Sequence, residues 1–136
     1  MAVELIDGQY HSVDSSEMAF RQAGRLAMDE GLRKCGATLL EPIERLTIHV
    51  PNSCTSSVTS LLSSRRGQVL GFGPRDGWTG WDSVEAYLPQ AERYDLIGEL
   101  RSLSQGLGSF EFAFDHMTEV QGRLADDIAS KAKATA

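Results

Sequence analysis

Four stretches of the chain have the apolar pattern of β-strands. Apolar side chains alternate with other side chains in residues 46–50, 84–88 and 110–114, and residues 68–72 form a short run before a turn-rich segment. A period of two places every second side chain on the same face of a sheet. These residues therefore predict four strands, most of them with one buried face.

Two helices are predicted between these strands. Apolar side chains recur every three or four positions through residues 58–65 and again through 96–103, and a glycine follows each segment. The resulting order is the ferredoxin-like βαββαβ arrangement, an α+β fold with both helices on one face of an antiparallel sheet. We expect this sheet to span residues 46–115. Its helix-covered face should bury three alternating aromatic side chains: Phe110, Phe112 and Phe114.

The first part of the chain has a different pattern. The apolar stretch Val3–Ile6 predicts a short strand, followed by a polar loop and a long helix for which Asp14 and Glu17 have capping-box spacing. Gly36 is placed to end this helix, and an extended segment follows at 38–43. Mostly small side chains share one helical face and predict close packing on a sheet: Phe20, Ala23, Gly24, Ala27 and Gly31.

The pattern divides the chain into three parts. One strand, one helix and a further strand cannot close a hydrophobic core, because so small a sheet leaves an apolar flank uncovered. Residues 1–43 therefore predict a partial α+β domain that lacks its beginning and leaves a sheet edge exposed. Residues 44–120 predict the complete unit. Leu124 and Ile128 lie four positions apart, so residues 121–136 predict a short terminal helix and tail.

The composition is that of a folded protein with an acidic balance. Hydrophobic residues make up 41% and charged residues 24% of the 136 residues, and 13 Lys and Arg against 19 Asp and Glu give a formal charge of −6. This balance argues against binding nucleic acid by bulk electrostatics, so any RNA contact must be local. No apolar run approaches the roughly 18 residues of a membrane-spanning helix. The first residues lack a secretory signal pattern, and we expect a cytoplasmic protein without a membrane partner.

Patterns for catalysis and metal binding are weak. Cys35 and Cys54 form no CxxC pair and have no His at ligand spacing, so they predict free thiols and no metal site. His11, Asp14 and Ser15 are the residue types of a catalytic triad, but Asp14 and Ser15 stand where a helix start needs capping groups, and no GxSxG occurs. The chain also has no GxxxxGK[ST], so it has no P-loop for GTP. We expect no catalytic residues and no cofactor in this chain.

Two predicted helix ends carry arginine. The first helix ends in Arg65 and Arg66, and Arg101 with Ser102 and Gln105 occupies the equivalent place in the second half. The helix dipole favours cations at a C-terminus, so these arginines can be simple charged caps. A guanidinium also matches phosphate oxygens bidentately, so the two ends could instead form a phosphate-contacting pair.

Three aromatic side chains lie in predicted connections. His11 is in the polar loop before the first helix, where an imidazole can form hydrogen bonds or stack on a base, or be an ordinary surface histidine. Trp78 and Trp81 lie between the second and third strands of the ferredoxin-like unit. They could stack on RNA, but packing at the edge of the sheet is the favoured interpretation.

Four separate segments resemble the C-terminal part of elongation factor G in amino-acid sequence and in order. They are DGQYHSVDSSEMAF (7–20), LLEPI (39–43), SSRRGQVLG (63–71) and ELRSLSQGLGSFEFAFDH (99–116). The resemblance implies that residues 1–43 are the end of the family's fourth domain, which has a ribosomal protein S5 domain 2-like fold. Residues 44–120 would be its ferredoxin-like fifth domain.

The resemblance also implies a function and a set of contacts. It implies a ribosome-binding region of a translational GTPase that promotes GTP-dependent tRNA–mRNA translocation, with GTP, Mg and the N-terminal GTPase domains belonging to the parent protein. His11 would lie at the domain tip that enters the decoding centre beside tRNA and mRNA, with Gly8 and Tyr10 shaping its loop. The contacts implied with large-subunit rRNA are Arg65, Arg66, Arg101, Ser102 and Gln105.

Two segments differ from the family's usual sequence and leave alternative functions open. SSVTSLL (56–62) stands where the family usually has Gly-Asp-Val-x-Gly-Asp-Leu, and QAERYDLIG (90–98) where it tends to have Leu-Ala-Glu-Met-Phe-Gly-Tyr-Ala-Thr. These differences suggest a divergent paralogue that acts in ribosome recycling or ribosome protection. The alternative of another class is a free-standing ferredoxin-like ligand-binding domain or enzyme, which would need a pocket with convergent polar groups.

Overall fold

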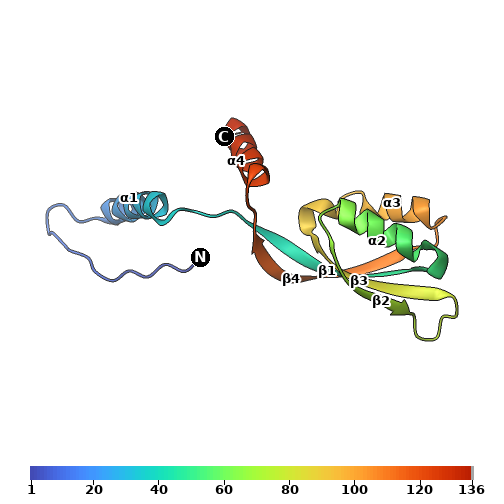
Figure 1. The fold of residues 1–136 in the computed structure, drawn as a ribbon. Coiled ribbons are helices and arrows are strands. Elements are labelled where there is room, and N and C mark those ends of the chain that lie inside the picture. Colours follow the sequence, from blue (N-terminus) through green and yellow to red (C-terminus); the bar gives the residue numbers. More distant parts are fainter. Residues whose placement is uncertain (136) are drawn as a thin grey trace. The chain divides into compact units, whose positions relative to one another are not determined.

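The protein divides into two compact units. The computed structural model describes residues 1–135, with a first unit of Met1–Thr38 and a second that begins at Leu39 (Figure 1). The first unit contains one helix, and the second contains all the strands.

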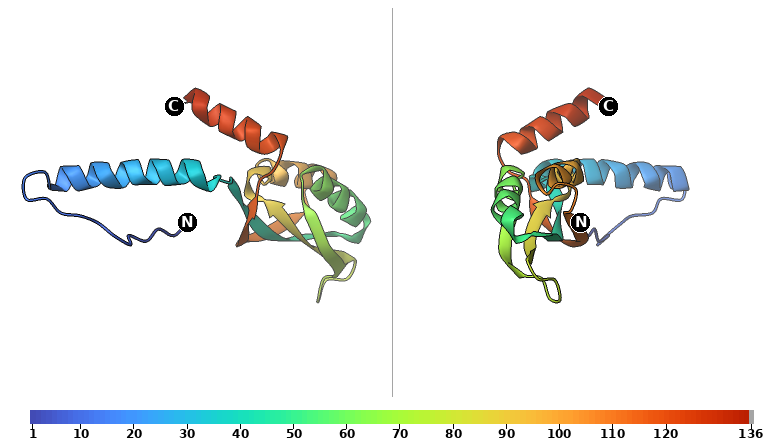
Figure 2. Two further views of the ribbon diagram at one scale, coloured as in Figure 1. Left: turned by 60° about the vertical axis from the view of Figure 1, so that its left-hand side comes forward. Right: turned by 90° about the vertical axis from the view of Figure 1, so that its right-hand side faces the viewer.

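The second unit is a four-stranded antiparallel sheet covered on one face by two helices (Figures 1 and 2). Its strands lie in the order β2-β3-β1-β4, so β1 and β3 are central and β2 and β4 are edges. This is the predicted α+β, ferredoxin-like arrangement. The elements are β1 (Leu40–Pro51), α2 (Thr55–Ser64), β2 (Gln68–Pro74), β3 (Trp81–Pro89), α3 (Leu96–Leu103) and β4 (Ser109–Glu119).

The hydrophobic core lies between the sheet and the two helices. It takes its side chains from the predicted alternating positions of the central strands and from the inner faces of the helices. Ten residues of this core have no exposed surface: Leu46, Ile48, Val50, Val58, Leu62, Val84, Ala86, Leu88, Leu96 and Leu100. Burial of this apolar surface is the main stabilising contribution to the unit.

The three phenylalanines of β4 share the helix-covered face, as predicted, but their burial is graded. Phe110 and Phe112 pair with Ile48 and Leu46, whose side chains are fully buried. Phe110 packs against the core, whereas Phe112 is 49% and Phe114 64% exposed, so the prediction that all three are buried was wrong. The reason is that β4 is an edge strand, and the helices do not cover its whole length.

Strand β1 continues through the boundary that the sequence pattern placed between residues 43 and 44. Its first residues pair with the last residues of β4, from Leu40 opposite Glu119 to Ile43 opposite His116, with an irregularity in register between Ile43 and Glu44. The extended segment expected at 38–43 is therefore largely the start of the longest strand of the second unit. In this respect the structural division differs from the expected one.

The first unit is built around α1 (Glu17–Cys35), and the N-cap of this helix is not the predicted residue. Ser16 is the N-cap, and its side chain accepts a hydrogen bond from the Ala19 backbone N–H at 3.1 Å, so the assignment of Asp14 to this role was wrong. Gly36 ends the helix in the left-handed conformation, as predicted. Residues 3–6 form no strand, because they have no partner strand among the described residues.

The small face of α1 does not make the predicted close approach. A Cβ atom placed on Gly24 or Gly31 would meet no atom of the described chain within 4 Å, and no residue of α1 is buried. A terminal helix, α4 (Arg123–Thr135), is present as expected, and both cysteines are free thiols. None of the helices in residues 1–135 is long and apolar enough to cross a membrane.

Gly67 provides a direct test of the packing between α2 and the sheet. A Cβ atom at this position would lie 2.7 Å from the Leu62 carbonyl oxygen and 3.2 Å from Leu88 Cδ1. Since the first of these atoms is backbone, we expect Gly67→Ala to lower the free energy of unfolding by about 1–3 kcal/mol. Chemical denaturation of the two proteins would measure the difference.

Gly71 is the matched control for this substitution. A Cβ atom there would meet nothing within 4 Å, and the strand residue needs no positive φ. Gly71→Ala should therefore leave stability unchanged or raise it slightly. Equal losses in the two variants would show that the close contact at Gly67 does not limit packing.

Candidate nucleic-acid interface

The loop that carries His11 is exposed and held by local hydrogen bonds. Ser15 Oγ accepts from the His11 backbone N–H at 2.7 Å, and the Ser15 N–H donates to the His11 carbonyl at 2.9 Å. Asp7 Oδ1 accepts from the Gly8 N–H at 2.7 Å, and Tyr10 is 73% exposed. These bonds fix the backbone on both sides of two exposed rings, so the loop can present them to a partner.

Arg65, one of the predicted RNA contacts, is used to join the two helices. Its side chain is 14% exposed, and Nη1 donates at 2.7 Å to the carbonyl oxygens of both Glu92 and Tyr94. Its Nη2 donates at 2.6 Å to Glu99 Oε1. With three bonds to the segment that begins α3, this guanidinium links the end of α2 to the start of α3.

Arg66 is held by two carboxylates. It binds both oxygens of Glu41, at 2.7 and 3.1 Å, and Glu92 Oε1 at 3.0 Å. The hydrogen bonding of the Arg66 guanidinium to the Glu41 carboxylate is the largest influence that raises the pKa of Arg66, burial opposes it, and the hydrogen bond to Glu92 adds to the rise. The residue also has φ +58°, a left-handed conformation that is unfavourable for a side chain with Cβ. These contacts stabilise a strained backbone and leave little of the charge available for a phosphate.

The end of α3 is more accessible. Arg101, Ser102 and Gln105 are exposed, and Arg101 makes no ion pair among the described residues. The turn beneath them is fixed by buried Ser104, whose Oγ donates to the Leu100 carbonyl at 2.6 Å and accepts from the Gly108 N–H at 2.7 Å. Gln105 has φ +55°, so both arginine-bearing helices end in a left-handed residue.

The structure does not bring the two arginine-bearing ends together. Arg65 at the end of α2 bonds to the start of α3, and Cys54 before α2 lies 3.7 Å from the Leu103 carbonyl at the end of α3. The helices are therefore antiparallel, and their C-terminal ends lie at opposite ends of the helix layer. At 1.5 Å per residue, the ten residues of α2 separate them by about 15 Å. The two ends therefore do not meet at one phosphate, and contact of either end with RNA stays a prediction.

An ion pair beside the core was not predicted from the sequence. Glu44 is 4% exposed, and its Oε2 lies 2.7 Å from Arg93 Nε, which does not point at the oxygen well enough for a hydrogen bond. The Arg93 guanidinium also lies 3.9 Å above the Phe112 ring. The sequence did contain a signal for a buried carboxylate that needs a partner. The alternation of residues 46, 48 and 50 extends back to Glu44 and places its side chain on the covered face.

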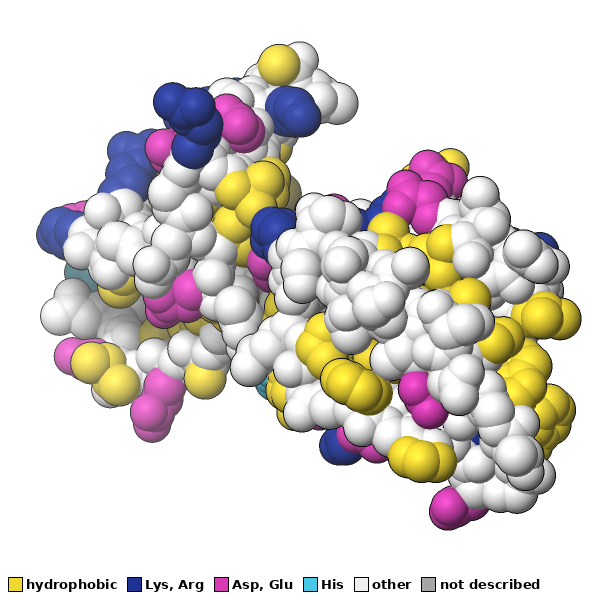
Figure 3. Space-filling view, turned by 45° about the vertical axis from the view of Figure 1, so that its right-hand side comes forward, with side chains coloured by type: hydrophobic (Ala, Val, Ile, Leu, Met, Phe, Trp, Pro, Cys, Tyr) yellow, Lys and Arg dark blue, Asp and Glu magenta, His cyan; other side chains and the backbone are white. Residues whose placement is uncertain are grey.

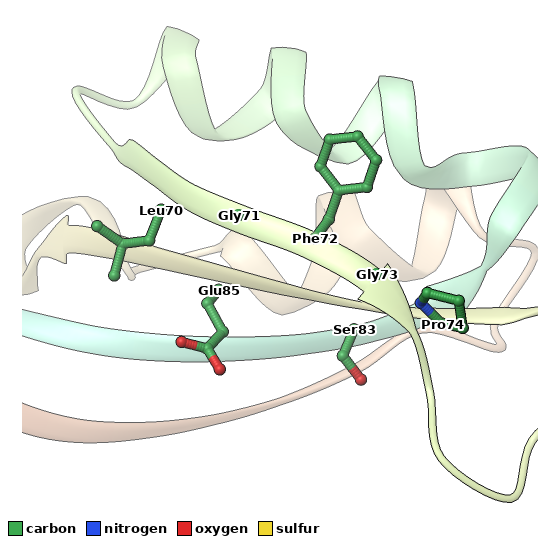
Figure 4. Close-up of a pocket in the computed structure, with 7 residues that line it drawn as sticks. All are labelled: Leu70, Gly71, Phe72, Gly73, Pro74, Ser83 and Glu85. Atoms are coloured by element: carbon green, nitrogen blue, oxygen red, sulfur yellow. The ribbon is translucent and has the colours of Figure 1, made fainter.

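The open face of the sheet is mainly polar and is hollowed beside edge strand β2. Figure 4 shows Ser83 and Glu85 pointing away from the helix layer, whereas Phe72 points toward it, with Gly71 and Gly73 between. The lining side chains therefore do not converge on one position, as a small-molecule site would require. Among residues 1–135, no three His, Cys, Asp or Glu side chains are grouped to hold a metal ion.

The space-filling view shows how unevenly charge is distributed over the visible surface. In Figure 3, hydrophobic side chains and white atoms, which are backbone or other uncharged side chains, occupy most of the visible surface at the right, which belongs to the second unit. Several large apolar side chains of this unit are at least half exposed, including Phe72, Trp78, Tyr94 and Leu107. Exposed aromatic and apolar side chains are thus available for local contacts.

The chain is similar in sequence to elongation factors along nearly its whole length. The family described as "Elongation factor G C-terminus" matches residues 38–128, and "Elongation factor G, domain IV" matches residues 1–36. An elongation factor G-like protein of Synechocystis sp. is 50% identical over 128 residues, covering 94% of this chain and 19% of the relative. Elongation factor G of Jannaschia sp. is 42% identical over 129 residues, covering 95% and 18%.

The chain is also similar to a solved structure. A crystal structure of a Thermus thermophilus protein matches 92% of this chain and 18% of its own length, with a TM-score of 0.81 and 35% identity. The chain thus spans about a fifth of the length of these relatives.

The different environments of the arginines predict different effects on stability. We expect Arg65→Ala to lower the free energy of unfolding by about 1–3 kcal/mol, because it leaves two carbonyls and a carboxylate without their donor. Arg101→Ala should change it by less than about 0.5 kcal/mol, since no ion pair is lost. Denaturant titrations would test this, and a small effect of Arg65→Ala would show that its contacts are not structural.

His49 predicts a dependence of stability on pH. It lies on the open face with Nδ1 2.9 Å from Ser83 Oγ, and burial first, then the charge of Arg75, lowers its pKa while Glu111 opposes the shift. The unfolded chain, with a His pKa of about 6.5, therefore binds the proton more readily. Stability should be retained above pH about 6.5 and fall below it. His49→Gln should reduce this loss in unfolding measurements at several pH values, and an unchanged pH profile would contradict the assignment.

Proposed function

The chain belongs to the elongation factor G family, and on this basis we propose that it is the ribosome-contacting C-terminal region of a translational GTPase. In this proposal it promotes movement of tRNA and mRNA during protein synthesis. The observation that carries the proposal is the match of both units, in order, to the fourth and C-terminal domains of that family. GTP and Mg would be bound by GTPase domains of the full-length protein, which would act in the cytoplasm.

The two units would make different contacts. The loop with Gly8, Tyr10 and His11 is exposed and locally hydrogen-bonded, which suits a tip that reaches tRNA and mRNA at the decoding centre. The exposed end of α3, with Arg101 and its neighbours, suits a contact with rRNA, because its cation is not held by a carboxylate. Arg65 and Arg66 would support this surface indirectly by holding the helices in place.

A divergent paralogue that acts in ribosome recycling or protection is the second candidate. It is favoured by the higher identity to an elongation factor G-like protein, 50%, than to the elongation factor G of Jannaschia, 42%. Residues 56–62, one of the two divergent segments, lie in α2, whose exposed residues are all serines. Both candidates require ribosome binding, and they differ in the step that GTP hydrolysis serves.

Substitutions in the two contact surfaces should have different effects in the full-length protein. His11→Ala should slow translocation while leaving ribosome binding and GTP turnover nearly unchanged, because the tip acts only when the factor is engaged. Arg101→Ala should weaken ribosome binding and reduce the salt slope of affinity by about one, the effect of losing one phosphate contact. Rapid-kinetics translocation assays and salt-dependent binding titrations would measure these effects.

The outcomes distinguish the two candidates. Arg33→Ala, in the last turn of α1, is a matched control because it removes an exposed arginine outside both surfaces. Normal translocation by the His11 variant would contradict the tip assignment. Absence of any translocation activity in the wild type, together with ribosome binding, would favour recycling or protection.

A further inference from the structure

The connection between β2 and β3 presents an aromatic side chain stacked with a cation. The Arg75 guanidinium lies 4.2 Å from the centre of the Trp78 ring, and Trp81 meets Trp78 edge to face at 5.3 Å. Trp78 remains 50% exposed. We call residues 75–81 the tryptophan tip. Packing at the edge of the sheet, the interpretation favoured from sequence, accounts for Trp81 but leaves half of Trp78 in solvent.

The tryptophan tip is held in one conformation by its backbone. The Arg75 N–H donates to the Trp81 carbonyl at 2.8 Å, and the Trp78 N–H donates to the Arg75 carbonyl at 3.1 Å. The Asn52 N–H, beyond the end of β1, donates to the Gly80 carbonyl at 2.9 Å. A preorganised loop loses less conformational entropy when it binds, which favours a binding role.

Arg75 differs from most arginines of the second unit. Six arginines lie between residues 39 and 120, and four of them form ion pairs: Arg45, Arg65, Arg66 and Arg93. Arg75 and Arg101 form none among the described residues. Asp76 is the one carboxylate within the connection, and nearby Asp82 already accepts from Thr55 Oγ1 at 2.7 Å. Arg75 is therefore free to neutralise an anion.

Arg75 and Arg101 lie at the same end of the sheet and helix layer. Pro51 at the end of β1 pairs with Trp81, so the tip adjoins the start of α2. Cys54, just before α2, lies beside the Leu103 carbonyl at the end of α3, which carries Arg101 and Gln105. The end that holds Arg65 and Arg66 is the opposite one.

We propose that the tryptophan tip binds an unstacked RNA base, with the base against Trp78 and the adjoining phosphate on Arg75. Unpaired bases stack on exposed indole and guanidinium planes, and this contact is local enough for an acidic domain. The inference rests on the proposed ribosome contact and adds a second element to it, at the same end as Arg101. A protein partner would instead be expected to exploit the apolar ring without requiring the unpaired cation.

The chain offers its own reporter for this contact, because its two tryptophans both lie in the tip. Titration with an adenylate decamer should quench tryptophan fluorescence to saturation. Affinity, followed by anisotropy of labelled decamer, should fall about tenfold in Trp78→Ala, as expected for loss of one base stack. Trp78→Phe should retain much of the binding, and Arg75→Ala should lower the salt slope by about one.

Tyr94→Ala is the matched control, since Tyr94 is 82% exposed but lies beside the opposite end of the helix layer. It should bind as the wild type does, and thermal melts would show that each variant is folded. Ultraviolet irradiation of complexes with the decamer and with purified ribosomes should yield a nucleotide attached to Trp78.

Other outcomes would overturn the inference. If Trp78→Ala binds ribosomes as the wild type does, and the decamer does not quench the wild-type fluorescence, the RNA contact of the tryptophan tip is refuted. The proposed ribosome function would be unaffected by that result. A cross-link from Trp78 to a ribosomal protein would identify a protein partner and refute the RNA contact. Failure of the whole chain to bind ribosomes would contradict the proposed function. The decamer titration would still show whether the tryptophan tip binds RNA.

Discussion

Two helices packed on one face of a four-stranded sheet are the constraint from which most features of the second unit follow. The helices supply Val58, Leu62, Leu96 and Leu100 to a core whose strand side chains come from the two central strands. Their cover is narrower than the sheet, so the outer aromatic side chains of β4 stay partly exposed. The two helices are antiparallel, so the end of α2 lies beside the start of α3. The C-terminal ends of the two helices, which occupy equivalent positions in the two halves, therefore lie at opposite ends of the helix layer.

Electrostatics within this layer decide which charges remain for a partner. In an acidic unit, carboxylates on β1, on β3 and around the start of α3 pair with four arginines that would otherwise look like RNA contacts. Arg66 is the clearest case, since its contacts with Glu41 and Glu92 stabilise a left-handed backbone. Among the six arginines of residues 39–120, the two without an ion pair, Arg75 and Arg101, lie at one end of the sheet and helix layer, which gives a net acidic domain a local surface suited to phosphate.

In the proposed ribosome factor, the residues that stabilise the fold differ from those that would contact the ribosome. Arg65, which links the two helices, and Ser104, which fixes the turn after α3, are largely covered. The proposed contacts lie instead in exposed loops and at the exposed end of α3. Rigid turns on a packed scaffold can vary in sequence without loss of the fold.

The sequence alone determined the order of elements in the second unit, the inward faces of its central strands and the family, because these depend on local periodicity and on the identity of short segments. It also placed His11 in an exposed loop and Gly36 at a helix end. Only the tertiary structure showed that Ser16 caps α1, that Phe112 and Phe114 lie beyond the helix cover, and that Arg93 pairs with Glu44. Whether an arginine is bound by a carboxylate or free depends on residues 25 or more positions away in sequence, as for Arg66 with Glu41 and Glu92. Such partners are brought together by chain folding, and no local pattern encodes them.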